Sequence, residues 1–177
     1  MVHLILGGAR SGKSSYAESL AKDFSNKGVG DKVIYVATAT ADDKEMETRI
    51  SYHKKNRPPE WLLVEEPFLL SSIVNQHKDS KNILLIDCLT LWLSNWLCKK
   101  VDPQQSNWDE ESNHFLESLI KSSSTIFIVS NEVGSGIVPM GELTREFSDK
   151  AGWLNQKVAS VADKVTLVVA GLPVELK

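Results

Sequence analysis

The N-terminal stretch Met1–Ser14 reads MVHLILGGARSGKS, and it decides the fold. A short apolar run over Val2–Leu6 predicts a buried strand, and the residues from Ser14 onward have the pattern of a helix. Between them, Gly7–Ser14 spell G-x-x-x-x-G-K-S. The order strand, glycine loop, helix is the context in which this motif binds the phosphates of a nucleotide.

Each part of this loop suits a phosphate. Gly7, Gly8 and Gly12 lack a Cβ, so the backbone N–H groups can approach phosphate oxygens closely. Lys13 is predicted to reach the β- and γ-phosphates as a catalytic cation, and the Ser14 hydroxyl to bind Mg²⁺. The alternative is a glycine turn that binds nothing. The predicted nucleotide-binding residues of the loop are Gly7, Gly8, Ala9, Arg10, Ser11, Gly12, Lys13 and Ser14.

Length and composition predict one domain over residues 1–177. The chain is 42% hydrophobic and 24% charged, which is typical of a globular protein with a real core. A net charge of −3 gives no basic footprint for nucleic acid, and no apolar run reaches the length of a membrane span. Cys88 and Cys98 make neither a disulfide framework nor a metal-ligand spacing, so a reducing, cytoplasmic setting is expected.

Apolar, β-branched runs alternate with segments of helical spacing along the rest of the chain. This alternation predicts an α/β fold of three layers, with a mainly parallel sheet and an antiparallel hairpin at one edge. The predicted strands after the first are Lys32–Ala37, Trp61–Val64, Ile83–Asp87, Thr125–Ser130, Lys164–Ala170 and Val174–Leu176. The predicted helices are Ser14–Phe24, Asp42–Lys55, Phe68–His77, Cys88–Leu97, Trp108–Lys121 and Leu143–Val161.

The segment Cys88–Leu97 is apolar almost all round and contains Trp92 and Trp96. A helix of this kind is buried, either in the core or in a contact between subunits. The sequence leaves both possibilities open.

Polar residues stand at the ends of three of the predicted strands: Asp87 ends one, and the pair Glu65 and Glu66 and the pair Asn131 and Glu132 follow two others. In a parallel sheet they lie at the carboxyl edge, where ligands bind. Asp87 is the predicted second Mg²⁺ ligand, directly or through water, with a helix N-cap as the alternative. One of the two glutamates can receive a ribose or a base, and the Asn–Glu pair the acceptor substrate or the nucleotide. A solvated turn is the alternative for the two glutamates, while turn chemistry for Asn131 and a surface carboxylate for Glu132 are the alternatives for the second pair.

His53 is the candidate nucleophile. A neutral imidazole attacks phosphorus well, and one ring nitrogen can be held while the other reacts. Lys54, Lys55 and Arg57 follow closely and can clamp a polyphosphate. Spacing alone favours the other interpretation, a histidine and a solvated basic run at the C-terminal end of a helix.

Six segments of the chain occur together in one order: GGARSGKS (7–14), YVATA (35–39), DDKEMETRISYHKKNRPPEW (42–61), DCLTLWLSN (87–95), SNEVGSGIVP (130–139) and LTREFSDKAGWLNQKVASVAD (143–163). In this combination they resemble the bifunctional adenosylcobinamide kinase / adenosylcobinamide-phosphate guanylyltransferase family of cobalamin biosynthesis. The resemblance covers nearly the whole chain. The phosphate-binding loop is common to many NTPases, whereas HKKNRPPEW and SNEVGSGIVP are far more specific.

The resemblance implies two reactions. A nucleoside triphosphate, ATP or GTP, phosphorylates the aminopropanol hydroxyl of adenosylcobinamide. GTP then guanylylates an enzyme histidine, and the GMP passes to adenosylcobinamide phosphate to give adenosylcobinamide-GDP. The family's guanylylated histidine matches His53, which Tyr52 precedes where some members carry a second histidine.

The same resemblance implies a RecA-like P-loop fold, a homotrimer and a set of nucleotide contacts. These contacts are the loop itself with Ala37, Thr38, Ala39, Lys54, Lys55, Asn56, Arg57, Glu65 and Asp87. Two other classes of function stay open at this point: a small-molecule kinase with one activity, in which His53 is structural, and a nucleotide-regulated binding module.

Overall fold

A computed structural model describes residues 1–30, 32–40, 58–98 and 107–177. Over these residues the chain forms one seven-stranded sheet with the order β3-β2-β4-β5-β1-β6-β7. All neighbours pair in parallel except β6 and β7, which form an antiparallel hairpin at one edge. The strands are β1 (Val2–Gly7), β2 (Lys32–Ala37), β3 (Leu62–Glu65), β4 (Asn82–Asp87), β5 (Thr125–Asn131), β6 (Lys164–Val169) and β7 (Leu172–Glu175).

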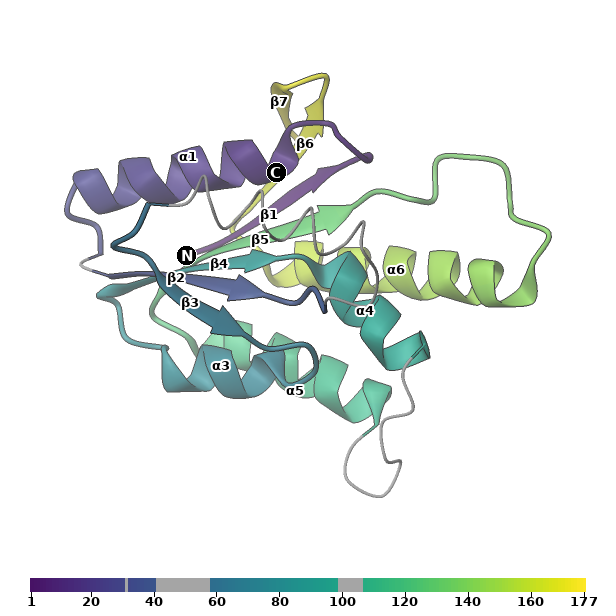
Figure 1. Cartoon of the computed structure of the whole chain (residues 1–177), viewed down its shortest axis with the longest axis horizontal. Coiled ribbons are helices and arrows are strands. Elements are labelled where there is room, and N and C mark those ends of the chain that lie inside the picture. Colours follow the sequence, from purple (N-terminus) through teal and green to yellow (C-terminus); the bar gives the residue numbers. More distant parts are fainter. Residues whose placement is uncertain (31, 41–57, 99–106) are drawn as a thin grey trace.

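Helices lie on both faces of the sheet, so the predicted three-layer α/β fold is confirmed (Figure 1). In the described part of the chain, α1 covers one face, while α3, α4, α5 and α6 contribute to the core on the other. Their bounds are α1 (Lys13–Asn26), α3 (Leu70–Gln76), α4 (Leu89–Cys98), α5 (Trp108–Lys121) and α6 (Glu142–Val161). None of these described helices is long and apolar enough to cross a membrane.

Side chains alternate between the two faces, as the period of a strand requires. On β1, Ile5 packs with Ala17 and Ala21 of α1, while its neighbour Leu4 packs with the helices of the opposite face. On β5, Phe127 and Val129 share the α1 face with Ile5. Both layers of the core are therefore apolar, which explains why the strands read as nearly continuous hydrophobic runs.

The apolar helix α4 belongs to the core. Trp92 is fully buried, with its ring centroid 4.9 Å from that of Trp108 and 5.1 Å from that of Phe115. The indole N–H groups of Trp92 and Trp96 both donate to the carbonyl of Phe68, at 2.7 and 3.2 Å. Of the two possibilities that the sequence left open, packing within the chain accounts for Trp92.

The edge hairpin differs from its predicted boundaries. The sequence places a turn after Ala170, but the chain reverses at Ala170–Gly171, where φ is +52° and +80°. Two successive positive φ values define the tight turn that matches strand twist in a two-residue hairpin. Leu172 and Pro173 thus belong to β7, and Pro173 is tolerated because β7 is an edge strand. The predicted helix Asp42–Lys55 lies in residues 41–57, outside the described part.

Candidate active site

The loop between β1 and α1 is held by backbone hydrogen bonds from both neighbouring strands. The N–H of Glu132, just after β5, donates to the carbonyl of Gly7 at 3.1 Å. From the other side, the N–H of Gly171 in the hairpin turn donates to the carbonyl of Ser11 at 2.8 Å. The loop is therefore fixed between β5 and the β6–β7 turn before any ligand arrives.

Two of its glycines are required by geometry. A Cβ on Gly7 would overlap the Ser11 hydroxyl and lie 2.7 Å from the carbonyl oxygen of Val168. Gly12 has φ +93°, and a Cβ there would lie 3.2 Å from the Cα of Gly171. Gly8 has open space around it. The motif's first and last glycines thus set the shape of the loop, whereas Gly8 is under no such restriction.

Helix α1 begins at Lys13 with Gly12 as its N-cap. Glycine has no side chain to cap the first turn, so an anion can accept hydrogen bonds from the N–H groups there and benefit from the helix dipole. The Lys13 ammonium lies over the loop and donates to the carbonyl of Gly8 at 3.0 Å, with the residue only 9% exposed. The cation and the N–H donors of an anion site are already together.

Asp87 lies at the carboxyl end of β4, two strands from β1. It shares the α1 face with Tyr35, whose hydroxyl donates to Asp87 Oδ2 at 3.0 Å. This bond orients the carboxylate. The Ser14 hydroxyl and the Asp87 carboxylate are hard oxygen donors, which Mg²⁺ prefers, so the residues present fit that ion. Among the described residues there is no cluster of three or more His, Cys, Asp or Glu that could hold a metal without the help of substrate phosphates.

Thr38 ties β2 to β4 beside this carboxylate. Its hydroxyl donates to the Cys88 carbonyl and accepts from the Cys88 N–H, both at 2.8 Å. Its carbonyl accepts from the Asn95 amide at 2.8 Å, and its side chain is fully buried. Thr38, a predicted nucleotide contact, therefore already has protein partners for its polar groups.

Burial and the nearby Asp87 raise the pKa of the Cys88 thiol to about 12, so it is protonated at neutral pH and not a nucleophile.

The two glutamates after β3 have different environments. Glu66 Oε1 accepts from the N–H groups of Phe68 and Leu69, both at 2.8 Å, so it stabilises the turn that leads into α3. Glu65 is exposed at the end of β3. It lies four strand positions from β1, which is about 19 Å at the usual spacing of strands. Of the pair, Glu65 is the exposed residue at this edge of the sheet, where a ribose or base can reach it.

Asn131 and Glu132 lie between the phosphate-binding loop and α6. Asn131 pairs with Gly7, and its N–H donates to the Thr90 hydroxyl at 2.7 Å. The Asn155 amide of α6 donates to the Asn131 carbonyl at 3.1 Å. The Glu132 carboxylate accepts from the Gly134 N–H at 2.7 Å, so part of it is used in the local turn.

Several predicted site residues lie outside the described part of the chain: His53, Lys54, Lys55, Asn56 and Arg57. Among the described residues, the sheet brings the glycine loop, Asp87, Ala37 and Glu65 to one edge. Sequence reasoning missed the supporting residues Tyr35, Thr90, Asn95 and Asn155. Their types are common in strands and helices, so only the three-dimensional neighbours reveal what they hold.

The fold and this loop define the chain as a P-loop nucleotide-binding protein. Solved structures agree on the fold: flagellar accessory protein FlaH from Methanocaldococcus jannaschii matches with a TM-score of 0.54 at 16% identity, covering 99% of this chain and 77% of FlaH. A second solved structure, an ATPase domain, matches with a TM-score of 0.50 at 14% identity, covering 94% of this chain and 68% of that domain. At such low identity these two similarities establish the fold alone.

The family follows from sequence. Residues 3–176 match the family described as cobinamide kinase / cobinamide phosphate guanyltransferase, and the chain belongs to it. The bifunctional adenosylcobalamin biosynthesis protein CobP of Pseudomonas aeruginosa is 47% identical over the whole of this chain and 98% of its own length. The bifunctional protein CobU of Escherichia coli is 37% identical over the full length of both. The chain is accordingly an enzyme with kinase and guanylyltransferase activities, as the resemblance implied.

Proposed function

We propose that one nucleotide site, built on Gly7–Ser14, serves both reactions of this enzyme. The observation that carries the proposal is the prebuilt anion site, in which Lys13 and the first turn of α1 converge on the loop. In the kinase step, the hydroxyl of adenosylcobinamide attacks the γ-phosphorus of ATP or GTP, the nucleoside diphosphate leaves, and the hydroxyl proton is released. In the transferase step, His53 attacks the α-phosphorus of GTP and pyrophosphate leaves.

Both steps build negative charge on phosphate oxygens. Lys13 and the loop N–H groups are fixed before the reaction, so they stabilise that charge without reorganising. Ser14 and Asp87 would hold Mg²⁺, which supplies charge neutralisation at the phosphates when it is bound. Tyr35 keeps the Asp87 carboxylate oriented for that role.

In this proposal the ribose and base of the nucleotide lie on the β2–β3 side of the sheet. We propose that Ala37, Ala39 and Glu65 contact the ribose or base. The distance of about 19 Å across four strand positions is compatible with an extended nucleoside triphosphate. The predicted basic clamp of Lys54, Lys55, Asn56 and Arg57 belongs to the same proposal. A homotrimer and a cytoplasmic location are also proposed, on the family resemblance.

The covalent step is a two-stage transfer. The His53 nitrogen forms a bond to the α-phosphorus as the bond to pyrophosphate breaks. The phosphate of adenosylcobinamide phosphate then attacks the same phosphorus and releases the histidine. Splitting one transfer into two steps in this way is the usual advantage of a nucleophilic catalyst.

Incubation with GTP labelled at the α-phosphorus tests the transferase step. The wild-type protein is expected to keep the label after denaturation and to lose it to adenosylcobinamide phosphate. His53→Ala is expected to retain no label while it still phosphorylates adenosylcobinamide, because only the second reaction uses the histidine. His114→Ala is a matched control, since His114 lies outside the family motifs. Label retained on His53→Ala refutes the assignment of the nucleophile.

A further inference from the structure

The loop between β5 and α6 carries large apolar side chains that are exposed to solvent. Ile137 is 98% exposed and Met140 is 97% exposed. The N-terminal half of α6 continues this surface: no residue of Glu142–Lys150 is buried, and Trp153 in the next turn is 61% exposed. An exposed apolar surface of this kind, with polar residues around it, marks a binding site.

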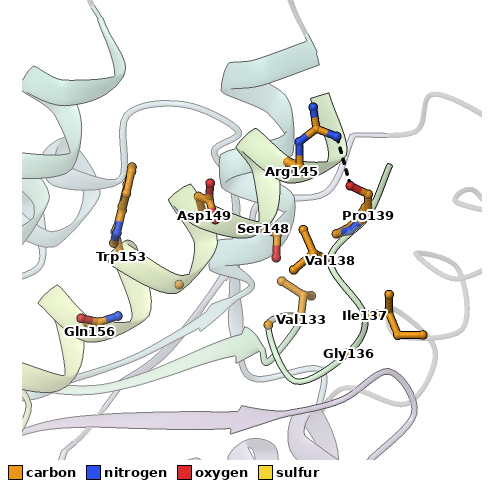
Figure 2. Close-up of a pocket in the computed structure, with 12 residues that line it drawn as sticks. Val133, Gly136, Ile137, Val138, Pro139, Arg145, Ser148, Asp149, Trp153 and Gln156 are labelled. Carbon is orange, nitrogen blue, oxygen red and sulfur yellow. Dashed lines mark hydrogen bonds between the residues drawn. The ribbon is translucent and has the colours of Figure 1, made fainter. Parts of the chain in front are cut away.

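The surface is hollowed. A cavity of about 270 Å³ lies between the loop and α6, with Val133 and Val138 on the loop side and Ser148 on the helix side (Figure 2). Asp149, Trp153 and Gln156 extend the lining along α6. Apolar walls with a few placed polar groups are the usual chemistry of a site for an organic ligand.

Hydrogen bonds fix both ends of the loop that lines the hollow, and one of these ends adjoins the phosphate site. At the near end, the Asn155 amide donates to the Asn131 carbonyl, and the Glu132 N–H donates to the carbonyl of Gly7 in the phosphate loop. At the far end, the Arg145 guanidinium donates to the carbonyls of Pro139, at 3.2 Å, and Met140. Val133, the first residue that lines the hollow, thus directly follows Glu132, which contacts the phosphate-binding loop.

We propose that this hollow, the acceptor groove, binds the corrin ring of the cobinamide acceptor. A corrin is a broad, apolar ring with neutral carboxamides around its edge. Val133, Val138 and Trp153 offer apolar contact, and Ser148, Asp149 and Gln156 offer partners for carboxamides. The aminopropanol arm then extends along Glu132 toward the phosphates on the loop. The assignment rests on the proposed function, which requires a large acceptor beside the nucleotide.

A hollow with hydroxyl, carboxylate and amide groups suits this acceptor better than it suits a second copy of the chain. A stable contact between copies needs a broad complementary patch with a dry apolar centre. Here polar groups of α6 lie inside the hollow. A contact between copies would bury them, and leaving them without hydrogen-bond partners is unfavourable. The carboxamides of the acceptor supply both donors and acceptors.

Equilibrium dialysis with adenosylcobinamide tests the assignment, using the full chain and reading the corrin by its visible absorbance. Trp153→Ala and Ile137→Ser are expected to weaken binding about tenfold and about fivefold, as loss of an aromatic anchor and of apolar contact does. Ile120→Ser is the matched control, because Ile120 is 66% exposed on α5, and it should bind as the wild type does. Circular dichroism and sedimentation velocity are measured on every variant.

Guanylylation of the protein by GTP alone separates this inference from the proposed function. It needs no corrinoid, so both groove variants should label as fast as the wild type. An absence of labelling in the wild type refutes the transferase proposal, while dialysis still reads the groove. Unchanged binding in both variants, no binding by the wild type, or weaker binding that comes with a changed sedimentation coefficient overturns the acceptor groove. The last result would assign this surface to a contact between copies.

Discussion

Two loops leave the carboxyl edge of the sheet from neighbouring strands, and they are built in opposite ways. The loop after β1 is short, and hydrogen bonds from the backbone N–H groups of Glu132 and Gly171 fix it on both sides. The loop after β5 is longer, anchored at its ends by Asn155 and Arg145, with Ile137 almost fully exposed between them. A phosphate needs N–H groups in fixed positions, so its loop is rigid and polar. A large apolar acceptor needs area, so its loop is open and apolar.

The largest effect is expected from Lys13→Ala. Removing a charge that stabilises a transition state lowers the rate about 100- to 1,000-fold, and because one site serves both reactions, phosphorylation and guanylylation should fall together. Steady-state rates with saturating adenosylcobinamide, and the rate of protein labelling, measure the two reactions. Lys22→Ala, also on α1 but exposed, is the control. An unchanged rate in either reaction would mean that the two do not share this cation.

The glycines give the next largest effect and contrast the two loops directly. Gly7→Ala forces a Cβ against the Ser11 side chain and the Val168 carbonyl, and should lower the free energy of unfolding by about 1–3 kcal/mol. Gly136→Ala, in the loop after β5, meets open space and should change it by about 0.5 kcal/mol or less. Urea unfolding measures both. Equal losses would show that the two loops are equally constrained.

Arg145→Ala should have a smaller and selective effect. The guanidinium fixes the far end of the loop after β5 through the Pro139 and Met140 carbonyls, so its loss frees that loop. The KM for adenosylcobinamide should rise about threefold to tenfold, which corresponds to the net contribution of one or two charged hydrogen bonds. Labelling by GTP should keep its rate. A fall in labelling without a change in that KM contradicts the division of labour between the loops.

The smallest effect concerns the other end of β1, where His3 is buried and its Nε2 lies 2.8 Å from the Thr166 hydroxyl. Burial, and secondarily Lys164, lower the pKa of His3 below its usual 6.5, against a weaker opposing effect of Glu175. Below pH 6.5 the unfolded chain then binds more protons than the folded one, so stability falls as pH falls through 6.5 toward the folded pKa. His3→Gln should remove this part of the decline.

The measurement is the free energy of unfolding from pH 8 to pH 5 for the wild type and His3→Gln. His77, whose pKa burial also lowers, contributes in the same direction to both proteins, so the difference between them reports His3. Parallel curves would show that His3 does not titrate differently in the two states. Activity per folded molecule should not differ, since this end of β1 is remote from the phosphate loop.

The alternation of strands and helices was sufficient to predict the layers, the parallel sheet and the edge hairpin, because both faces of a covered sheet must be apolar. The phosphate loop was predictable because the motif G-x-x-x-x-G-K-S, placed between a strand and a helix, is typical of a phosphate-binding loop. The hairpin turn was placed wrongly, since Ala170 adopts a positive φ that its residue type does not announce. The orienting role of Tyr35 depends on Asp87, which is 52 residues away in the sequence, so no local pattern contains it. Glu66 accepts from the nearby N–H groups of Phe68 and Leu69, and only the structure shows which glutamate of the pair makes this turn.

If two chemistries share one nucleotide site, a single nucleotide analogue must block both of them equally. A GTP analogue with methylene groups in both phosphate bridges can bind that site but cannot donate a phosphoryl or guanylyl group. Its inhibition constant, measured against ATP in the kinase reaction and against GTP in protein guanylylation, tests the shared site most directly. We expect competitive inhibition with the same constant in both assays. Two different constants, or noncompetitive inhibition in either assay, would contradict a shared site.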